Sequence, residues 1–310
     1  MFLAFGACRK AYQILRDRDG VDMADILVLG NGPAGISAAI YAARAGLSVT
    51  VIGRDGGSLA KADKVENYYG FAEPVTGEAL HQAGIAQATR LGVEMVTGEV
   101  LSIGYAADGF EVGTANTRVE APAVILATGS SRKAPKMPGL AEYEGKGVSY
   151  CAVCDAFFYK GKDVAVLGDG DYALHEAAEL LPVAGSVTLI TNGNPAPAGV
   201  PDSLSIITEK IVALEGDTTL QTVRFADEHT IAVKGVFVAL GVAGSGDLAR
   251  KLGAELNGTS VVVDNAMQTA VPGLFAAGDC TGGLYQIAKA VYEGAVAGTS
   301  AVKFIRAAKK

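Results

Sequence analysis

One pattern occurs twice in the 310-residue chain and constrains its fold more than any other feature. Residues 24–53, ADILVLGNGPAGISAAIYAARAGLSVTVIG, read as a strand, a glycine-rich turn, a helix and a second strand, and residues 162–191 repeat this order. The runs ILVLG and VAVLG are short and continuous, which is typical of strands buried on both faces of a parallel sheet. The sequence therefore predicts an α/β protein with two Rossmann-like βαβ domains of three layers, a number that suits this length.

The order of the segments predicts that the second domain is inserted into the first. The stretch that follows the second pattern, SVVVDNAMQTAVPGLFAAGD and an alanine-rich helix from about Gln286, has no glycine loop of its own and is assigned to the first domain. Linkers are expected at GSSRKAPKMPG, residues 129–139, and at AGSGDLARKLG, residues 243–253. The expected organisation is a tail at 1–22, a discontinuous first domain at 23–131 and 243–310, and an inserted domain at 132–242.

Charge and cysteine content narrow the class of protein. The formal net charge is −7, which disfavours binding to nucleic acid or to an anionic membrane surface. No apolar run reaches the roughly 18 residues of a membrane-spanning helix. The four cysteines form no spaced framework, which is typical of a reducing compartment, so we expect a cytoplasmic protein.

The first glycine turn has the spacing of a dinucleotide-binding loop. Gly30, Gly32 and Gly35 form G-x-G-x-x-G directly after a strand, where glycines permit a tight turn, approach of a pyrophosphate and close helix packing. The acidic residue that usually ends the second strand and holds a ribose is missing, because VTVIG ends in Gly53. Asp55, two residues on, is a candidate substitute.

Two further turns favour a flavin as the bound nucleotide. AVILATGS (123–130) and GLFAAGDC (273–280) each run from a strand into small residues, where Asp279 can accept a hydrogen bond from a sugar or ribitol hydroxyl. The helix that starts near Gln286 would direct its positive N-terminus at a neighbouring group, which suits the negative charge of a reduced flavin. The candidate cofactor contacts in this part of the chain are Thr128, Gly129, Gly278, Asp279, Gln286 and Ile287.

Cys151 and Cys154, in SYCAVCDA, have a spacing used by structural disulfides, metal sites and redox couples. Zinc requires about four ligands, and His81, His175 and His229 have no metal-like spacing with the cysteines; we expect these histidines on solvated surfaces or as caps, and no metal. A large core needs no disulfide staple, so a redox couple is favoured. Asp155 follows directly and is expected either to exchange protons with the thiols or to cap the helix. Cys280 is expected to be a small packing residue.

From about residue 24 the chain resembles the low-molecular-weight thioredoxin reductases. The matching stretches, in the order of that family, are GNGPAG, GGSLAKADKVENYYGF, ILATGS, SYCAVCDA, VLGDGDYA and MQTAVPGLFAAGDC with Gln286. The resemblance implies a homodimer that binds FAD, with Cys151 exchanging with thioredoxin, Cys154 facing the flavin and Asp155 as the acid–base group. It also implies that FAD is held by Gly30, Gly32, Pro33, Ala34, Asn67, Asp279 and Gln286.

Three departures from the usual pattern concern the electron donor. Gly53 replaces the FAD-ribose acid, Ser58 replaces the usual glutamine in GGSL, and LITNGNPAPAG has no cations for the 2′-phosphate of NADPH. Asp169 and Asp171 add negative charge to the second glycine loop, which would repel a pyrophosphate. Together these departures resemble the ferredoxin-dependent flavin thioredoxin reductases. A ferredoxin is acidic, and the residues that could steer it are Arg132, Lys133, Lys136, Lys160 and Lys162.

Several alternatives stay open from the sequence. The donor could be NADPH or NADH with unusual recognition, or the chain could be a related flavin disulfide reductase with another donor or substrate. A flavin-containing redox sensor would complete one slow cycle without turnover on thioredoxin. A non-catalytic nucleotide-binding protein would purify without the yellow colour of a flavin.

Overall fold

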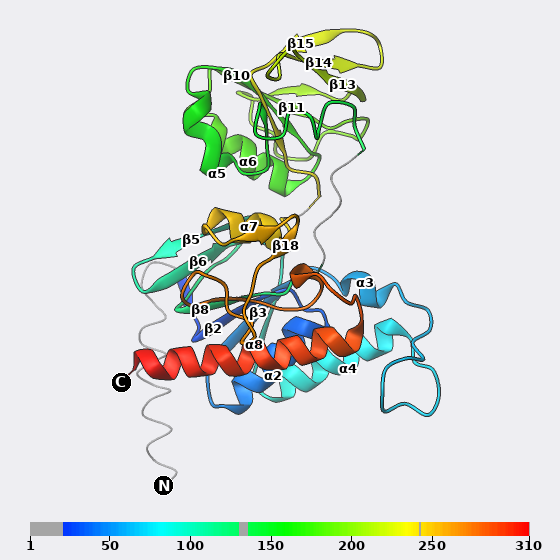
Figure 1. Cartoon of the computed structure of the whole chain (residues 1–310), viewed down its shortest axis with the longest axis vertical. Coiled ribbons are helices and arrows are strands. Elements are labelled where there is room, and N and C mark those ends of the chain that lie inside the picture. Colours follow the sequence, from blue (N-terminus) through cyan, green and yellow to red (C-terminus); the bar gives the residue numbers. More distant parts are fainter. Residues whose placement is uncertain (1–20, 130–135, 242, 310) are drawn as a thin grey trace. The chain divides into compact units, whose positions relative to one another are not determined.

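The computed structural model describes residues 21–129, 136–241 and 243–309, which form two compact units (Figure 1). Unit 1 combines residues 21–129 with 244–309, and unit 2 holds residues 136–241 and 243. Unit 2 is therefore inserted between two parts of unit 1 along the chain. Each unit contains a parallel sheet with the βαβ order that the repeated pattern predicts, so the expected α/β class with two Rossmann-like domains is confirmed.

Unit 1 is built on a five-stranded parallel sheet with the order β19-β8-β2-β3-β4. Every residue of β2 and β8 is buried, as expected for central strands covered on both faces. Helices α2, α4 and α8 lie together along one side of the sheet (Figure 1). The elements are β2 (Ile26–Leu29), α2 (Pro33–Arg44), β3 (Val49–Gly53), α3 (Gly57–Ala60), α4 (Gly77–Arg90), β4 (Glu94–Thr97), β8 (Ala123–Leu126), β19 (Leu274–Ala276), the 3₁₀ turn η3 (Asp279–Thr281) and α8 (Ile287–Ala308).

Helices α2 and α8 pack closely because small residues line their contact. A Cβ atom on Gly294 would lie 2.1 Å from the carbonyl oxygen of Ala34, and one on Gly298 would lie 2.4 Å from that of Ala38. Any larger residue at these positions would push the helices apart. The packing fixes the start of α8 beside the start of α2, which follows the first glycine turn.

A second sheet completes unit 1 and changes one predicted boundary. It has the order β1-β7-β6-β5, in which β1 pairs with β7 in parallel and the other pairs are antiparallel. Residues 21 and 22 belong to β1, so the predicted tail at 1–22 is wrong for these two; the pairing depends on a strand almost 100 residues away and has no local signal. Residues 1–20, with Cys8, lie outside the described part. The elements are β1 (Val21–Met23), β5 (Ser102–Ala106), β6 (Gly109–Gly113), β7 (Arg118–Ala121), α7 (Ser245–Lys251), β17 (Leu256–Asn257) and β18 (Ser260–Val261).

Unit 2 repeats the parallel architecture on a smaller scale. Its five-stranded parallel sheet has the order β12-β11-β10-β16-β9, and a three-stranded antiparallel sheet, β13-β14-β15, accompanies it. The elements are β9 (Val148–Ser149), α5 (Ala152–Asp155), the 3₁₀ turn η2 (Ala156–Tyr159), β10 (Asp163–Leu167), α6 (Asp171–Leu180), β11 (Ser186–Ile190), β12 (Ser205–Ile207), β13 (Ile211–Glu215), β14 (Thr222–Phe225), β15 (Thr230–Ala232) and β16 (Gly235–Val238).

The second predicted linker is wrong over most of its length. Residues 245–251 form α7, which is capped by the Asp247 side chain accepting from the backbone N–H of Gly244 at 3.0 Å. Ser245, Leu248 and Ala249 are fully buried, so this short helix belongs to the core of unit 1. The glycines at 244 and 246 suggested a loop, and tertiary burial overrides that local preference. Most of the first predicted linker, residues 130–135, lies outside the described residues.

Candidate functional site

The first glycine turn leaves the start of α2 open. A Cβ on Gly30 would lie 2.2 Å from the carbonyl oxygen of Ala127, so the turns after β2 and β8 are in contact. At Gly32, the N-cap of α2, no atom lies within 4 Å of the place where a Cβ would stand. Pro33 follows in the first turn, where its missing N–H costs nothing. The exposed backbone at this helix start can bind a phosphate group.

The turn after β8 is held by a residue of α7. The hydroxyl groups of Thr128 and Ser245 are hydrogen-bonded at 2.7 Å, and the Ser245 oxygen also accepts from the backbone N–H of Thr128 at 3.2 Å. Gly129 has a φ of 81°, in the left-handed region that favours glycine. Ser245 is fully buried and has no sequence signal, since it stands in the stretch predicted to be a linker.

A largely buried ion pair braces the turn that carries Asp279. The Lys289 ammonium donates to the Gly278 carbonyl at 2.8 Å and to the Thr281 hydroxyl at 2.9 Å, and it pairs with Glu293 at 3.0 Å. The same Glu293 carboxylate accepts from the backbone N–H of Gly278 at 2.8 Å. Burial raises the pKa of Asp279, and the nearby Lys289 charge partly opposes this. The sequence analysis missed this pair; its only signal is a Lys and a Glu four residues apart near a helix start.

Two residues expected to bind FAD come together from distant parts of the chain. The side-chain amide of Asn67 donates to the amide oxygen of Gln286 at 2.8 Å. Gln286 is the N-cap of α8, and Ile287 is its first residue. The contact places Asn67 at the α8 start, where the sequence predicts the cofactor.

Asp55, the candidate substitute for the missing strand-end acid, is already engaged. One carboxylate oxygen accepts from the backbone N–H of Gly57 at 2.9 Å, and the other pairs with Arg54 at 3.1 Å. The Gly57 hydrogen bond is the largest cause of a lowered Asp55 pKa. Asp55 therefore binds the backbone of Gly57, the first residue of α3, and both its oxygens are used locally.

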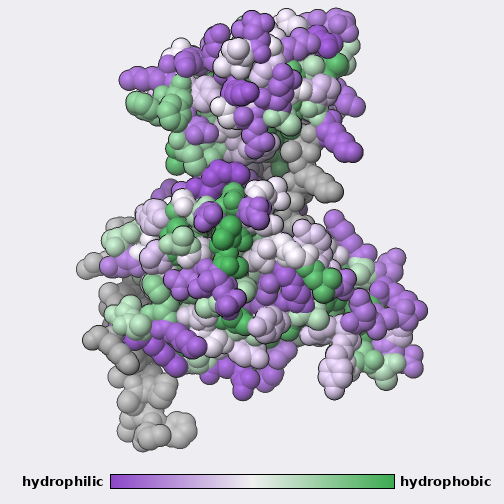
Figure 2. Space-filling view, viewed as in Figure 1, coloured by the Kyte–Doolittle hydropathy of each residue, from purple (hydrophilic) through white to green (hydrophobic). Residues whose placement is uncertain are grey.

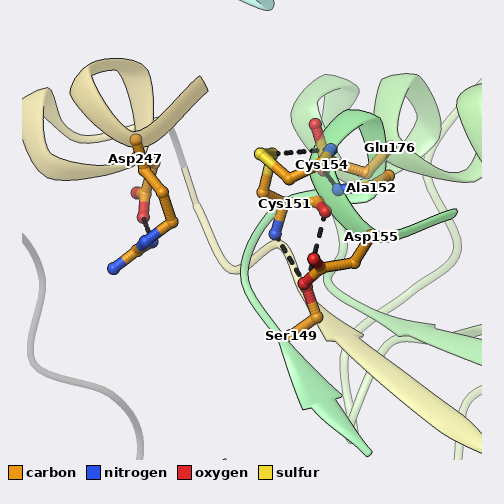
Figure 3. The surroundings of a disulfide bond; sticks show 8 residues. Ser149, Cys151, Ala152, Cys154, Asp155, Glu176 and Asp247 are labelled. Carbon is orange, nitrogen blue, oxygen red and sulfur yellow. Dashed lines mark hydrogen bonds and ion pairs between the residues drawn. A yellow bond between two sulfur atoms is a disulfide. The ribbon is translucent and has the colours of Figure 1, made fainter. Parts of the chain in front are cut away.

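Cys151 and Cys154 form a disulfide at the start of α5 (Figure 3). Cys151 is 1% exposed, whereas Cys154 is exposed. The backbone N–H of Cys154 donates to the Cys151 sulfur at 3.1 Å. Because α5 has only four residues, its summed dipole is small, and the Cys154 N–H is the hydrogen-bond donor that lies against the Cys151 sulfur.

Asp155 lies beside the disulfide and is oriented by Ser149. The Ser149 hydroxyl donates to an Asp155 carboxylate oxygen at 2.6 Å and accepts from the backbone N–H of Cys151 at 3.1 Å (Figure 3). On the other side, Glu176 of α6, 1% exposed, accepts from the backbone N–H of Ala152 at 2.7 Å. Ser149 and Glu176 were missed by the sequence analysis, although Ser149 belongs to the quoted SYCAVCDA.

Apolar side chains are exposed next to the disulfide. Val153, Phe157 and Phe158 are 58%, 79% and 67% exposed, and they lie on α5 and η2. Figure 2 shows hydrophobic side chains gathered at the edge of unit 2 over these two elements. An exposed apolar patch that includes aromatic side chains is typical of a surface that binds another protein.

The second glycine turn is hydrogen-bonded to the turn that follows β11. The side-chain amide of Asn194 donates to an Asp169 carboxylate oxygen at 2.7 Å, and the Thr191 hydroxyl donates to the Asn194 carbonyl. Asn192, with a φ of 53°, accepts from the backbone N–H of Ile211 at 2.8 Å. Residues 191–194 therefore form a self-bonded turn at the end of β11 with no cation among them.

Two of the histidines are less solvated than expected, and one of them, His175 on α6, is half-buried with its Nε2 atom enclosed. His81 was expected on a solvated surface but is 7% exposed, and its Nε2 lies 3.1 Å from the carbonyl oxygen of Asn31. His229 stacks on Phe225 at 4.3 Å between ring centroids in the turn between β14 and β15. Cys280 is buried, as expected of a packing residue, and burial raises the pKa of its thiol to about 11.

Comparison with known proteins identifies the class to which this fold and site belong. The profile of the pyridine nucleotide-disulphide oxidoreductase family matches residues 24–294, and the chain belongs to that family. A thioredoxin reductase of Aquifex aeolicus is 36% identical over 273 residues, which cover 82% of this chain and 84% of that protein. The resemblance predicted from the sequence motifs is thereby confirmed.

Two solved structures are close in fold. The atypical thioredoxin reductase TRi from Desulfovibrio vulgaris Hildenborough has a TM-score of 0.86 and 41% identity, covering 91% of this chain and 98% of that one. A ferredoxin-flavin thioredoxin reductase from Clostridium acetobutylicum has a TM-score of 0.71 and 32% identity, covering 93% and 99%. The chain is a thioredoxin reductase-like flavoprotein oxidoreductase whose cofactor is FAD. The open backbone at Gly32 and the braced turn at Asp279 fit this cofactor.

Proposed function

We propose that this chain reduces thioredoxin through the Cys151–Cys154 couple with electrons that reduced ferredoxin delivers to FAD. The observation that carries the choice of donor is the hydrogen bond between Asn194 and Asp169 across the second glycine turn. In an NADPH-binding domain this turn and strand end would receive the pyrophosphate and the 2′-phosphate.

The chemistry of that turn disfavours a pyridine nucleotide. Phosphate groups need cationic donors, of which arginine is the most effective. The turn offers instead the carboxylates of Asp169 and Asp171 and the uncharged residues 191–194. Binding would require breaking the contact between Asn194 and Asp169 and placing a diphosphate beside two like charges. The similarity to a ferredoxin-flavin enzyme of Clostridium acetobutylicum supports the same choice.

The residues around the disulfide account for thiol exchange. Bound FAD, once reduced by two ferredoxin molecules that give one electron each, would supply the electron pair that breaks the Cys151–Cys154 bond. The resulting Cys151 thiolate attacks the thioredoxin disulfide and forms a mixed disulfide, and Cys154 then attacks Cys151, which re-forms the original bond and releases dithiol thioredoxin. We assign the proton exchange with the thiols to Asp155, whose carboxylate accepts a hydrogen bond from the Ser149 hydroxyl. Because Cys151 is 1% exposed, its attack on a protein requires a rearrangement after reduction.

Two surfaces of unit 2 suit protein partners. The apolar group of Val153, Phe157 and Phe158 borders the exposed Cys154, which suits docking of thioredoxin. Lys136, Lys160 and Lys162 are exposed and could attract an acidic ferredoxin. Arg132 and Lys133 lie outside the described residues.

Rapid mixing under anaerobic conditions tests the donor. The purified yellow protein is mixed with reduced ferredoxin, NADPH or NADH, and loss of the flavin absorbance is followed. Fast bleaching by ferredoxin alone supports the proposal, and fast bleaching by NADPH or NADH supports the alternative of a pyridine-nucleotide enzyme with unusual recognition. Cys154→Ser is the matched control: its flavin should still be reduced, while thioredoxin turnover is lost.

The assembly and location of the protein are further parts of the proposal. We expect a homodimer, which light scattering of the FAD-loaded protein would test, and a cytoplasmic location. In the described part of the chain, no helix combines the length and apolar character needed to span a bilayer.

A further inference from the structure

A side chain from the first glycine turn occupies the space of the missing strand-end acid. A Cβ on Gly53, at the end of β3, would lie 2.5 Å from Asn31 Cγ and 2.8 Å from Asn31 Oδ1. Strands β2 and β3 are neighbours in the sheet, so Asn31, just after β2, reaches across to the end of β3. The Asn31 side chain therefore fills the space that a side chain at position 53 would occupy.

This arrangement forms one wall of a pocket. The pocket has a volume of about 240 Å³, and its lining includes Asn31, Gly53, Arg54, Asp55, Gly56 and His81. Among the described residues, no hydrogen bond involves the Asn31 side-chain amide, which is thus available to a ligand. Asp55 lines the same pocket, but both its oxygens already accept hydrogen bonds from Gly57 and Arg54.

His81 holds the backbone of Asn31 from behind. Its Nε2 lies 3.1 Å from the Asn31 carbonyl oxygen, and a carbonyl can only accept, so Nε2 carries the proton. In the neutral ring Nδ1 is then an acceptor, and it is buried without a partner beside Gly56 on the pocket wall.

We propose that Asn31 replaces the strand-end acid as the residue that binds the adenosine ribose of FAD. The amide oxygen accepts from a ribose hydroxyl, as a carboxylate would, and the amide nitrogen can also donate to the neighbouring hydroxyl. Gly53 is required because any side chain there would displace Asn31. The proposal rests on FAD as the cofactor and is independent of the electron donor.

Titration of the apoprotein tests the proposed contact. FAD affinity is measured by quenching of flavin fluorescence, alongside an FAD analogue whose adenosine ribose lacks both hydroxyls. Loss of a hydrogen bond of this kind costs about tenfold in affinity, so the native chain should bind the analogue that much more weakly. Asn31→Ala should bind FAD about tenfold more weakly and lose the preference for FAD over the analogue. If N31A keeps the preference for FAD over the analogue, the proposal is wrong. Loss of that preference in Asp55→Ala would then assign the ribose contact to Asp55.

An exchange of residues tests the steric relationship. Gly53→Glu should weaken FAD binding because the new side chain collides with Asn31. The double variant N31G/G53E moves the acceptor to the strand end and removes all the Asn31 side-chain atoms that would collide, Cβ included, so its FAD affinity should return to within about threefold of the native value. A folded double variant no better than G53E would contradict the arrangement. Far-ultraviolet circular dichroism checks the fold of each variant, and N31A decides the question if G53E does not fold.

Discussion

Lys289 and Glu293 form a salt bridge of 3.0 Å on α8 in which both side chains are largely buried, at 16% and 12% exposed. Breaking a buried pair leaves an uncompensated charge and costs more than an exposed pair would contribute. Because both partners also hydrogen-bond the turn at Gly278, they determine the position of Asp279.

We predict that Lys289→Met lowers the affinity for FAD by about tenfold. Burial raises the pKa of Asp279 and the Lys289 charge lowers it, so the variant should raise that pKa further. An acid with a higher pKa loses its charge earlier on acidification, so FAD affinity of the variant should begin to fall at a higher pH. Titrations of the apoprotein at several pH values measure both effects. Lys303→Met, on the exposed side of the same helix, is the control and should bind FAD normally.

Asp155 offers a test of proton exchange in the proposed reaction. Asp155→Asn should reduce thioredoxin turnover by about 100-fold while the donor still reduces the flavin at the native rate. Ser149→Ala, which removes the 2.6 Å hydrogen bond to Asp155, should have a smaller effect in the same direction. Stopped-flow absorbance separates flavin reduction from turnover. If D155N slows flavin reduction as much as it slows thioredoxin turnover, Asp155 does not act in the proton exchange of the thiols.

Glu176 supports the segment between the two cysteines. Glu176→Ala leaves the buried N–H of Ala152 without this acceptor, which should cost about 1–3 kcal/mol of local stability. Glu176→Gln keeps an acceptor oxygen and should cost less. Hydrogen exchange at residues 151–155 measures the local opening. Glu179 is exposed on the same helix, and Glu179→Ala should leave this exchange unchanged. An equal effect of Glu179→Ala would show that the change in exchange does not come from the hydrogen bond between Glu176 and Ala152.

The closed second glycine turn predicts a gain of function. Asp169→Asn combined with Asn194→Arg removes a repulsive charge and adds a cation, so reduction of the flavin by NADPH should become at least about tenfold faster. The rate of flavin bleaching by NADPH is the measurement. Asp202→Asn removes an exposed carboxylate elsewhere in unit 2 and should have no effect. If the native protein already reacts rapidly with NADPH, the reasoning on this turn fails.

Cys280 predicts a specific dependence of stability on alkaline pH. Burial raises the pKa of its thiol from 9.0 to about 11. A group whose pKa is raised by folding stabilises the fold below its unfolded pKa, and this contribution is lost as the pH rises to the folded pKa. The native protein should therefore lose about 2 kcal/mol of unfolding free energy between pH 9 and 11 that Cys280→Ala does not lose. Denaturant unfolding across this range compares the two, and parallel curves would contradict the prediction.

The sequence by itself determined the features that depend on local spacing. Two glycine turns after apolar strands required two parallel α/β domains, because the pattern of buried strands and tight turns is local. The spacing of Cys151 and Cys154 allowed a disulfide, because three residues bring the two sulfurs within bonding reach. The missing acid at Gly53 and the missing cations at 191–194 were also visible, since an absent residue type needs no structure to be noticed.

Only the tertiary structure decided which distant side chains compensate for these absences. Asn31 lies over Gly53, Asn194 pairs with Asp169, and Asn67 meets Gln286 across 219 positions of sequence. His81 is buried and residues 245–251 are helical, against expectation, because packing against other elements outweighs local preference. Contacts of this kind depend on how strands and helices are brought together, and a linear pattern of residues carries no record of that.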